Sequence, residues 1–228
     1  MATTEIDRDA LRRKYRAERD KRLRADGNEQ YVEPTGRYAH FLDDPYVPVE
    51  PREARTDEVT VAFIGGGFSG LITGAKLKEA GIDDVRIIEK GGDFGGTWYW
   101  NRYPGIMCDV ESYIYMPLLE DLGYIPEDRY ATGEEILAHL QAIASRYDLE
   151  RDALFHTAVT RAAWDDEVDR WAITTDRGDS FSCRYYVLAV GFLNLLKLPD
   201  IPGIDSFGGK AFHTARWDYD YTGGGPHS

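Results

Sequence analysis

The chain has 228 residues, 43% of them hydrophobic, which is enough to bury a sizeable core. Its formal net charge of -13 at pH 7 disfavours binding to nucleic acid and to anionic membrane surfaces. No apolar run approaches the roughly 20 residues that a membrane helix needs, and the N-terminus holds no signal-peptide core. The two cysteines, Cys108 and Cys183, have neither disulfide-framework nor metal-site spacing. We therefore expect a cytoplasmic protein with small-molecule partners, and no nucleic acid, membrane or metal among them.

Residues 1–57 are predicted to form a helical and proline-rich extension in front of the main domain. Residues 9–24 are typical of an exposed helix, because they are rich in basic side chains and have few spaced apolar anchors. A basic helix could attract an anionic partner, but the negative net charge favours a solvated helix that docks by a few side chains. The proline-rich stretch over 44–51 cannot continue a helix or a central strand, so we expect a linker packed on the surface.

A domain of the α/β class is predicted over residues 58–206. It opens with an apolar strand over 59–64, a glycine cluster, a helix that Gly81 ends and a second strand over 85–88. This order is typical of the βαβ unit of a Rossmann-like fold. Residues 158–190 then contain short strand patterns separated by a turn, which predict a small β-meander insertion.

A further helix is predicted in the middle of this domain. Thr132 and Glu135 have the spacing of a capping box, which marks the start of a helix. Ile136, Leu140 and Ile143 follow at intervals that place them on one helix face. We expect this helix to be structural, with that face in the core.

Residues 65–70, with the sequence GGGFSG, fit the G-x-G-x-x-G pattern between a strand and a helix. Gly65 permits the tight turn, Gly67 lets the backbone approach a pyrophosphate, and Gly70 lets the helix pack close to the sheet. Glu89 ends the second strand 19 residues after Gly70, where a carboxylate can accept hydrogen bonds from ribose hydroxyls. A glycine triplet alone is often only a turn, but this context favours nucleotide binding. The acid disfavours a 2′-phosphate, so the site suits FAD or NAD better than NADP.

A second glycine turn, Gly95-Gly96, follows Glu89 and precedes three consecutive aromatic residues. Such a turn lets another backbone segment approach a cofactor that extends beyond its adenosine. The aromatic run is by itself also compatible with a patch of the core. Residues 96–105, GTWYWNRYPG, together with 108–112, resemble the flavin-binding segment of Baeyer-Villiger monooxygenases.

A second resemblance to the same family lies at 207–217, where FGGKAFHTARW matches the four fixed positions of its F-x-G-x-x-x-H-x-x-x-W fingerprint. In the family this segment joins the FAD domain to the NADP domain, so the resemblance implies that His213 and Trp217 couple domains. Taken alone, a histidine is more often structural. The resemblance also implies that residues 207–228 are a junction leading to an NADP-binding domain absent from this chain. The N-terminal helix and residues 217–224 suggest the branch that accepts bulky, even polycyclic, ketones.

The resemblance implies an FAD-dependent monooxygenase that uses NADPH and O2 to insert one oxygen atom next to a ketone carbonyl, giving an ester or lactone. It implies that Asp109 orients a catalytic arginine expected beyond the end of this chain. The alternative for Asp109 is a surface or capping carboxylate. Met107 departs from the family, which often has a basic residue at that position. The implied cofactor contacts are Ser69, Glu89, Thr97, Trp98, Asp109 and Tyr115, with the backbone of Val159 near the adenine.

Two other functions are compatible with the sequence. No second G-x-G-x-x-G follows the fingerprint, so we expect a fragment that does not turn over alone. An N- or S-oxygenating flavin monooxygenase shares the fold, although Trp217 and the aromatic run favour the ketone oxidisers. A non-catalytic flavin-binding fragment is the alternative from another class, because the surface that normally meets the NADP domain would be exposed.

Overall fold

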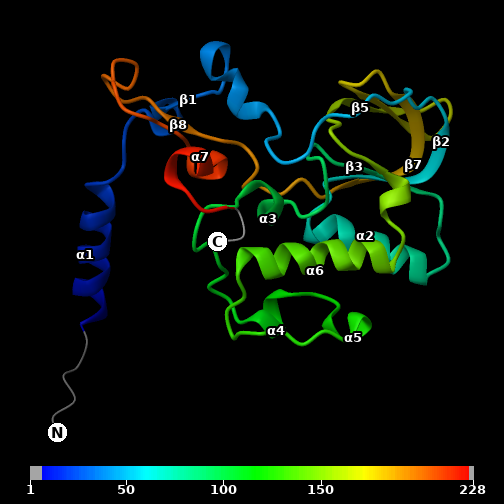
Figure 1. Cartoon of the computed structure of the whole chain (residues 1–228), viewed down its shortest axis with the longest axis horizontal. Helices are drawn as coiled ribbons and strands as arrows, with labels where there is room; N and C mark the ends of the chain where they lie inside the picture. Colours follow the sequence, from blue (N-terminus) through cyan, green and yellow to red (C-terminus); the bar gives the residue numbers. More distant parts are fainter. Residues whose placement is uncertain (1–6, 226–228) are drawn as a thin grey trace, which may run out of the picture.

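The computed structural model describes residues 7–225, whose body is a six-stranded mixed sheet with helices packed on one side (Figure 1). The strand order is β4-β3-β2-β7-β6-β5, in which the first four strands are parallel and the last two pairings are antiparallel. The strands are β2 Glu58–Ile64, β3 Val85–Ile88, β4 Ala153–Leu154, β5 Val159–Asp165, β6 Arg170–Thr175 and β7 Ser180–Leu188. The predicted βαβ opening is confirmed, since α2 (Phe68–Glu79) connects the parallel strands β2 and β3.

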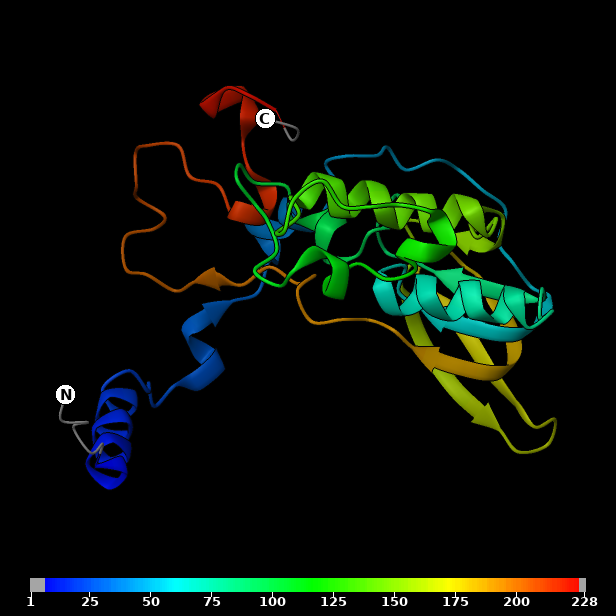
Figure 2. The same cartoon turned by 90° about the horizontal axis from the view of Figure 1, so that it is seen from below.

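Helices α2 and α6 (Gly133–Arg146) pack against each other on the same side of the sheet (Figure 1, Figure 2). The predicted apolar face of α6 is confirmed, because Ile136, Leu140 and Ile143 are fully buried in one cluster with Phe63 and Leu71. Burial of each such side chain stabilises the fold by roughly 1.5–3 kcal/mol. The shorter helices are α3 Thr97–Trp100, α4 Ser112–Tyr115, α5 Leu119–Leu122 and the 3-10 helix η3 Glu150–Asp152. None of the helices within 7–225 is long and apolar enough to cross a membrane.

The N-terminus of α6 forms half of the predicted capping box. Thr132 Oγ1 accepts a hydrogen bond from the backbone N–H of Glu135 at 3.2 Å. The Glu135 carboxylate accepts instead from the Tyr124 hydroxyl and the Glu127 N–H, at 2.8 and 2.9 Å. Glu135 therefore ties the preceding loop to the helix.

Thr132→Ala should lower the free energy of unfolding by about 1 kcal/mol, because the N–H of Glu135 loses its acceptor. Thr132→Ser keeps the hydroxyl and should stay close to the wild type. Denaturant unfolding followed by circular dichroism measures all three proteins. Equal stabilities of the alanine and serine variants would contradict a capping role for the hydroxyl.

The predicted β-meander is continuous with the parallel sheet. One edge of β7 pairs in parallel with β2, from Glu58 opposite Ser182 to Ile64 opposite Leu188. The other edge pairs antiparallel with β6. The β5–β6 hairpin therefore extends the same sheet, because β7 belongs to both the parallel and the antiparallel part.

The N-terminal extension contains a projecting helix and a short strand that pairs with a strand far away in the sequence. Helix α1 (Arg8–Asp20) projects from the body in both views and ends four residues before the predicted end (Figure 1, Figure 2). Strand β1 (Tyr31–Val32) pairs antiparallel with β8 (Leu198–Pro199). The remaining short elements are the 3-10 helices η1 Gly27–Gln30, η2 Gly36–Leu42 and η4 Thr214–Arg216, and helix α7 Tyr219–Thr222.

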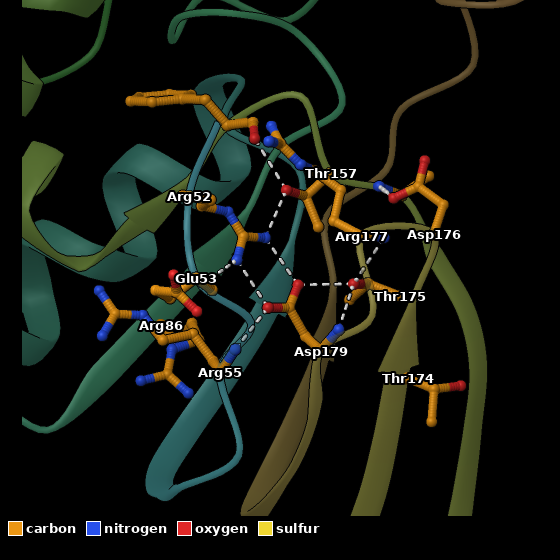
Figure 3. A network of polar contacts seen from close by, with 12 residues as sticks. Arg52, Glu53, Arg55, Arg86, Thr157, Thr174, Thr175, Asp176, Arg177 and Asp179 are labelled. Carbon is orange, nitrogen blue, oxygen red and sulfur yellow. Dashed lines mark hydrogen bonds and ion pairs between the residues drawn. The ribbon is translucent and has the colours of Figure 1, made fainter. Parts of the chain in front are cut away.

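An ion pair between Arg52, which directly follows the proline-rich stretch, and the buried Asp179 fixes the end of this stretch (Figure 3). The two terminal nitrogens of Arg52 donate to the two carboxylate oxygens of Asp179, both at 2.6 Å. Asp179 also accepts from the Thr175 hydroxyl and the Arg55 N–H, while Arg52 donates to Thr157. Burial alone would raise the pKa of Asp179, but the hydrogen bonds from Arg52 and Thr175 hold it well below its usual range. The extension is thus fixed to the turn between β6 and β7.

Candidate functional site

The G-x-G-x-x-G turn lies at the carboxyl end of β2 and is enclosed by backbone. Gly65 has a φ of +106°, and a Cβ there would lie 2.3 Å from the carbonyl oxygen of Ala189. A Cβ on Gly70 would lie 1.9 Å from the carbonyl oxygen of Gly65. Only glycine allows α2 to begin this close to the strand.

The second glycine turn packs directly on the first. The Gly95 N–H donates to the carbonyl oxygen of Gly66 at 3.0 Å, and a Cβ on Gly96 would lie 2.8 Å from Gly67 Cα. Gly67 itself has room, because a Cβ there would come no closer than 3.4 Å to a neighbour. Gly67 is also the N-cap of α2, and no side chain caps this helix. The first turn of α2 therefore leaves backbone N–H groups without side-chain acceptors, a favourable environment for an anion.

Glu89 directly follows β3 and is buried. Its Oε2 accepts from the Gly66 N–H at 2.5 Å, and its Oε1 accepts from the Gly91 N–H at 2.7 Å. Burial raises the pKa of Glu89, while these two N–H groups act in the opposite direction. The carboxylate therefore braces the first turn, and each oxygen keeps a lone pair for a ligand hydroxyl.

The aromatic run is part of the core. The sequence presented a core patch and a flavin-binding segment as alternatives, but a position in the core does not exclude a position in the wall of the site. Trp98, Tyr99 and Trp100 have only 6%, 1% and 3% of their surface exposed. Trp98 and Trp100 also line a cavity, and Trp98 Nε1 donates to the Tyr115 hydroxyl at 3.1 Å. The same side chains thus build the core and one wall of the site.

Two adjoining cavities form a continuous groove. The smaller, of about 170 Å³, covers the glycine turns and reaches Glu89. The larger, of about 800 Å³, extends to Asp109 and His213. The residues in the walls of both are Thr97, Trp98, Trp100, Tyr115, Phe192, Leu193 and Asn194. The groove therefore runs from the first glycine turn to the C-terminal segment.

Most residues predicted for the site line this groove. The smaller cavity has Gly65, Gly67, Ser69, Glu89, Gly96, Thr97, Trp98 and Tyr115 in its wall. Gly70, Val159 and Trp217 line neither cavity. Gly70 is buried beneath the turn, and Val159 begins β5. The adenine contact implied for Val159 stays a prediction.

Asp109 lies exposed in the wall of the larger cavity, beside Met107. Within residues 7–225 its carboxylate makes no hydrogen bond or ion pair. Arg129 pairs with Glu111 instead. Asp109 therefore has no arginine partner within residues 7–225.

His213 and Trp217, two of the four fingerprint residues, make local contacts. His213 Nδ1 accepts from the Ala215 N–H at 3.1 Å and caps η4. Burial, followed by the charge of Arg216, lowers the pKa of His213. Trp217 Nε1 donates to Thr222 Oγ1 at 3.0 Å. These contacts shape the segment itself, and His213 reaches the groove as part of its wall.

Sequence reasoning missed several residues of the groove. Phe192, Leu193 and Asn194 line both cavities where the chain leaves β7. Their position was the available signal, since ligands bind beyond the carboxyl ends of parallel strands. Arg216 lies over the Trp100 ring, 4.8 Å from its centroid, and brings a cation into the wall of the larger cavity.

Comparisons with known proteins agree with this arrangement. A family model described as an NAD(P)-binding Rossmann-like domain matches residues 64–122, which include both glycine turns. A Baeyer-Villiger monooxygenase of Streptomyces coelicolor is 52% identical over 217 residues, or 95% of this chain. Almost the whole chain is therefore similar to part of a Baeyer-Villiger monooxygenase.

Two further matches cover nearly the whole chain. Neopentalenolactone D synthase of Streptomyces avermitilis is 53% identical over 220 residues, or 96% of this chain. The structure of a polycyclic ketone monooxygenase from Thermothelomyces thermophila is 41% identical and has a TM-score of 0.87, again over 96% of this chain. The chain spans 36% and 37% of the length of the two Streptomyces relatives and 38% of the chain in that structure.

Proposed function

We propose that this chain binds FAD in the groove, as the FAD-binding part of a Baeyer-Villiger monooxygenase. The contact between the two glycine turns carries the proposal, because it leaves Gly67 and the uncapped start of α2 at the smaller cavity. A pyrophosphate needs this close approach of backbone and these N–H donors. Glu89 would accept hydrogen bonds from the ribose hydroxyls of the adenosine. Thr97, Trp98 and Tyr115 would lie along the flavin.

Bound FAD would supply the oxygenation chemistry, while the residues of the chain bind, orient and exclude water. The buried rings of Trp98 and Trp100 would keep water from the inner wall of the groove. Asp109 would orient an arginine, supplied from outside the described residues, through a charge-assisted hydrogen bond. The whole protein would use NADPH and O2 to convert a ketone into an ester or lactone.

The proposal also assigns the parts of the chain and a substrate class. Residues 58–206 would be the FAD-binding domain, preceded by the extension over 1–57. Residues 207–228 would be the junction to an NADP-binding domain, with 226–228 outside the described residues. Bulky or polycyclic ketones are the proposed substrates, supported by the match to the polycyclic ketone monooxygenase over 96% of this chain.

Retention of FAD by the purified chain is the direct test. We expect a visible flavin band that survives desalting, because the glycine turns and Glu89 hold the pyrophosphate and ribose. FMN lacks the adenosine half and should be lost on desalting, and NADP should not displace FAD. A folded chain that retains no flavin would contradict the proposal.

A further inference from the structure

The segment over 91–99, called loop 91–99 below, contains the second glycine turn and ends in the first residues of α3. A residue of the N-terminal extension contacts both of its ends. Asp44 has only 3% of its side chain exposed. Its Oδ2 accepts from the Gly92 N–H at 2.7 Å and from the Tyr99 hydroxyl at 2.5 Å. One carboxylate oxygen therefore joins the beginning of this loop to its end.

The remaining acceptor positions of Asp44 are also used. Its Oδ1 accepts from the backbone N–H groups of Tyr46 and Val47, at 2.9 and 3.4 Å, and His156 Nε2 lies 3.2 Å from its Oδ2. Burial alone would raise the pKa of Asp44, but the hydrogen bonds from Tyr99 and from backbone N–H groups outweigh it and lower the pKa. The group is therefore a buried carboxylate at neutral pH.

Packing around the first residues of the loop leaves no room for a side chain at Gly91 or Gly92. A Cβ on Gly92 would lie 2.4 Å from Val47 Cβ and 2.6 Å from His156 Nε2. A Cβ on Gly91 would lie 2.9 Å from the Tyr99 ring. The loop backbone thus rests on the extension at one side and on its own aromatic end at the other.

We propose that Asp44 is a positioning residue for the cofactor site, which holds the Gly95-Gly96 turn against Gly67. The inference rests on the proposed binding of FAD. Gly92 and Tyr99 flank the turn on either side, and the turn itself donates to the first glycine turn through the Gly95 N–H. Release of the loop by loss of Asp44 removes the support for that contact, so the cradle at Gly67 loses its shape.

Asp44→Asn in the full chain tests the proposal. The asparagine amide has the same size as the carboxylate. In either orientation its NH2 group faces a backbone N–H donor, so one hydrogen bond is lost. The affinity for FAD, measured by flavin fluorescence titration, should fall by about tenfold or more. Asp179→Asn is the matched control, because it also removes a buried aspartate that anchors the extension but has no contact with loop 91–99. Its affinity for FAD should stay within about twofold of the wild type.

Melting temperature and far-ultraviolet circular dichroism of each protein without FAD separate loss of fold from loss of positioning. Wild-type affinity in Asp44→Asn, or equal weakening in both variants, would overturn the proposal. A wild-type chain that binds no FAD would instead overturn the proposed function and this inference with it. Should Asp44→Asn fail to fold, Tyr99→Phe decides, because it keeps the buried ring and removes only the hydroxyl. Weaker FAD binding by folded Tyr99→Phe supports the proposal, and unchanged binding overturns it.

Discussion

Gly67→Ala should leave the chain folded while weakening FAD binding roughly tenfold to hundredfold. The backbone of Gly67, with a φ of -85°, suits alanine, and the new Cβ would come no closer than 3.4 Å to a neighbour. The methyl group would instead fill the space where a pyrophosphate approaches the backbone. Flavin fluorescence titration measures the affinity, and thermal melting without FAD measures the stability.

Gly70→Ala is the contrasting variant within the same turn. Its Cβ would lie 1.9 Å from the carbonyl oxygen of Gly65, and a backbone atom cannot move aside without opening the turn. We expect a loss of about 3 kcal/mol or more in the free energy of unfolding, or no folding at all. Gly208→Ala is the control, since its Cβ meets nothing within 4 Å.

For the first variant, wild-type FAD affinity in Gly67→Ala would show that the pyrophosphate does not bind at this turn.

The parts of the fold that the sequence predicts correctly are those whose signals lie close together in the chain. Strands β2 and β3 and the turn between β2 and α2 each have their own local pattern; β3 forms at the predicted residues and β2 begins one residue earlier. Helix α1 ends earlier than predicted, because none of its residues is buried and no packing fixes its end. Local periodicity therefore identifies an element better than it identifies the end of an exposed one.

The contacts that the sequence did not predict join residues that lie far apart in the sequence. Asp44 begins the proline-rich stretch and Arg52 directly follows it, and nothing in their spacing indicates Gly92 or Asp179 as partners. Strand β7 joins β2 across most of the domain, which periodicity cannot specify. The stretch that the sequence predicts to be a surface linker is therefore fixed to the domain through the side chains of Asp44 and Arg52.

Arg52→Ala should lower the free energy of unfolding by about 3 kcal/mol at pH 7. It leaves the fully buried Asp179 carboxylate without the paired hydrogen bonds of the guanidinium. Arg52→Lys keeps the charge but not the fork, so its stability should lie between the two. Arg55→Ala is the matched control, because Arg55 is exposed and bonds Asp179 only through its backbone. Its stability should stay within about 0.5 kcal/mol of the wild type.

The stability difference between wild type and Arg52→Ala should also depend on pH. The folded pKa of Asp179 lies below the ordinary value of 3.8, so the ionised carboxylate stabilises the fold above that pH. This contribution is lost as the pH falls through the ordinary value towards the folded pKa. Removal of Arg52 raises the folded pKa of Asp179 in the variant, because burial then acts without the opposing guanidinium. Urea unfolding of both proteins from about pH 7 to about pH 3 should therefore show the difference shrinking as the pH falls. A difference that is the same at both ends would assign the effect of Arg52 to side-chain packing, because only the ion pair depends on the charge of Asp179.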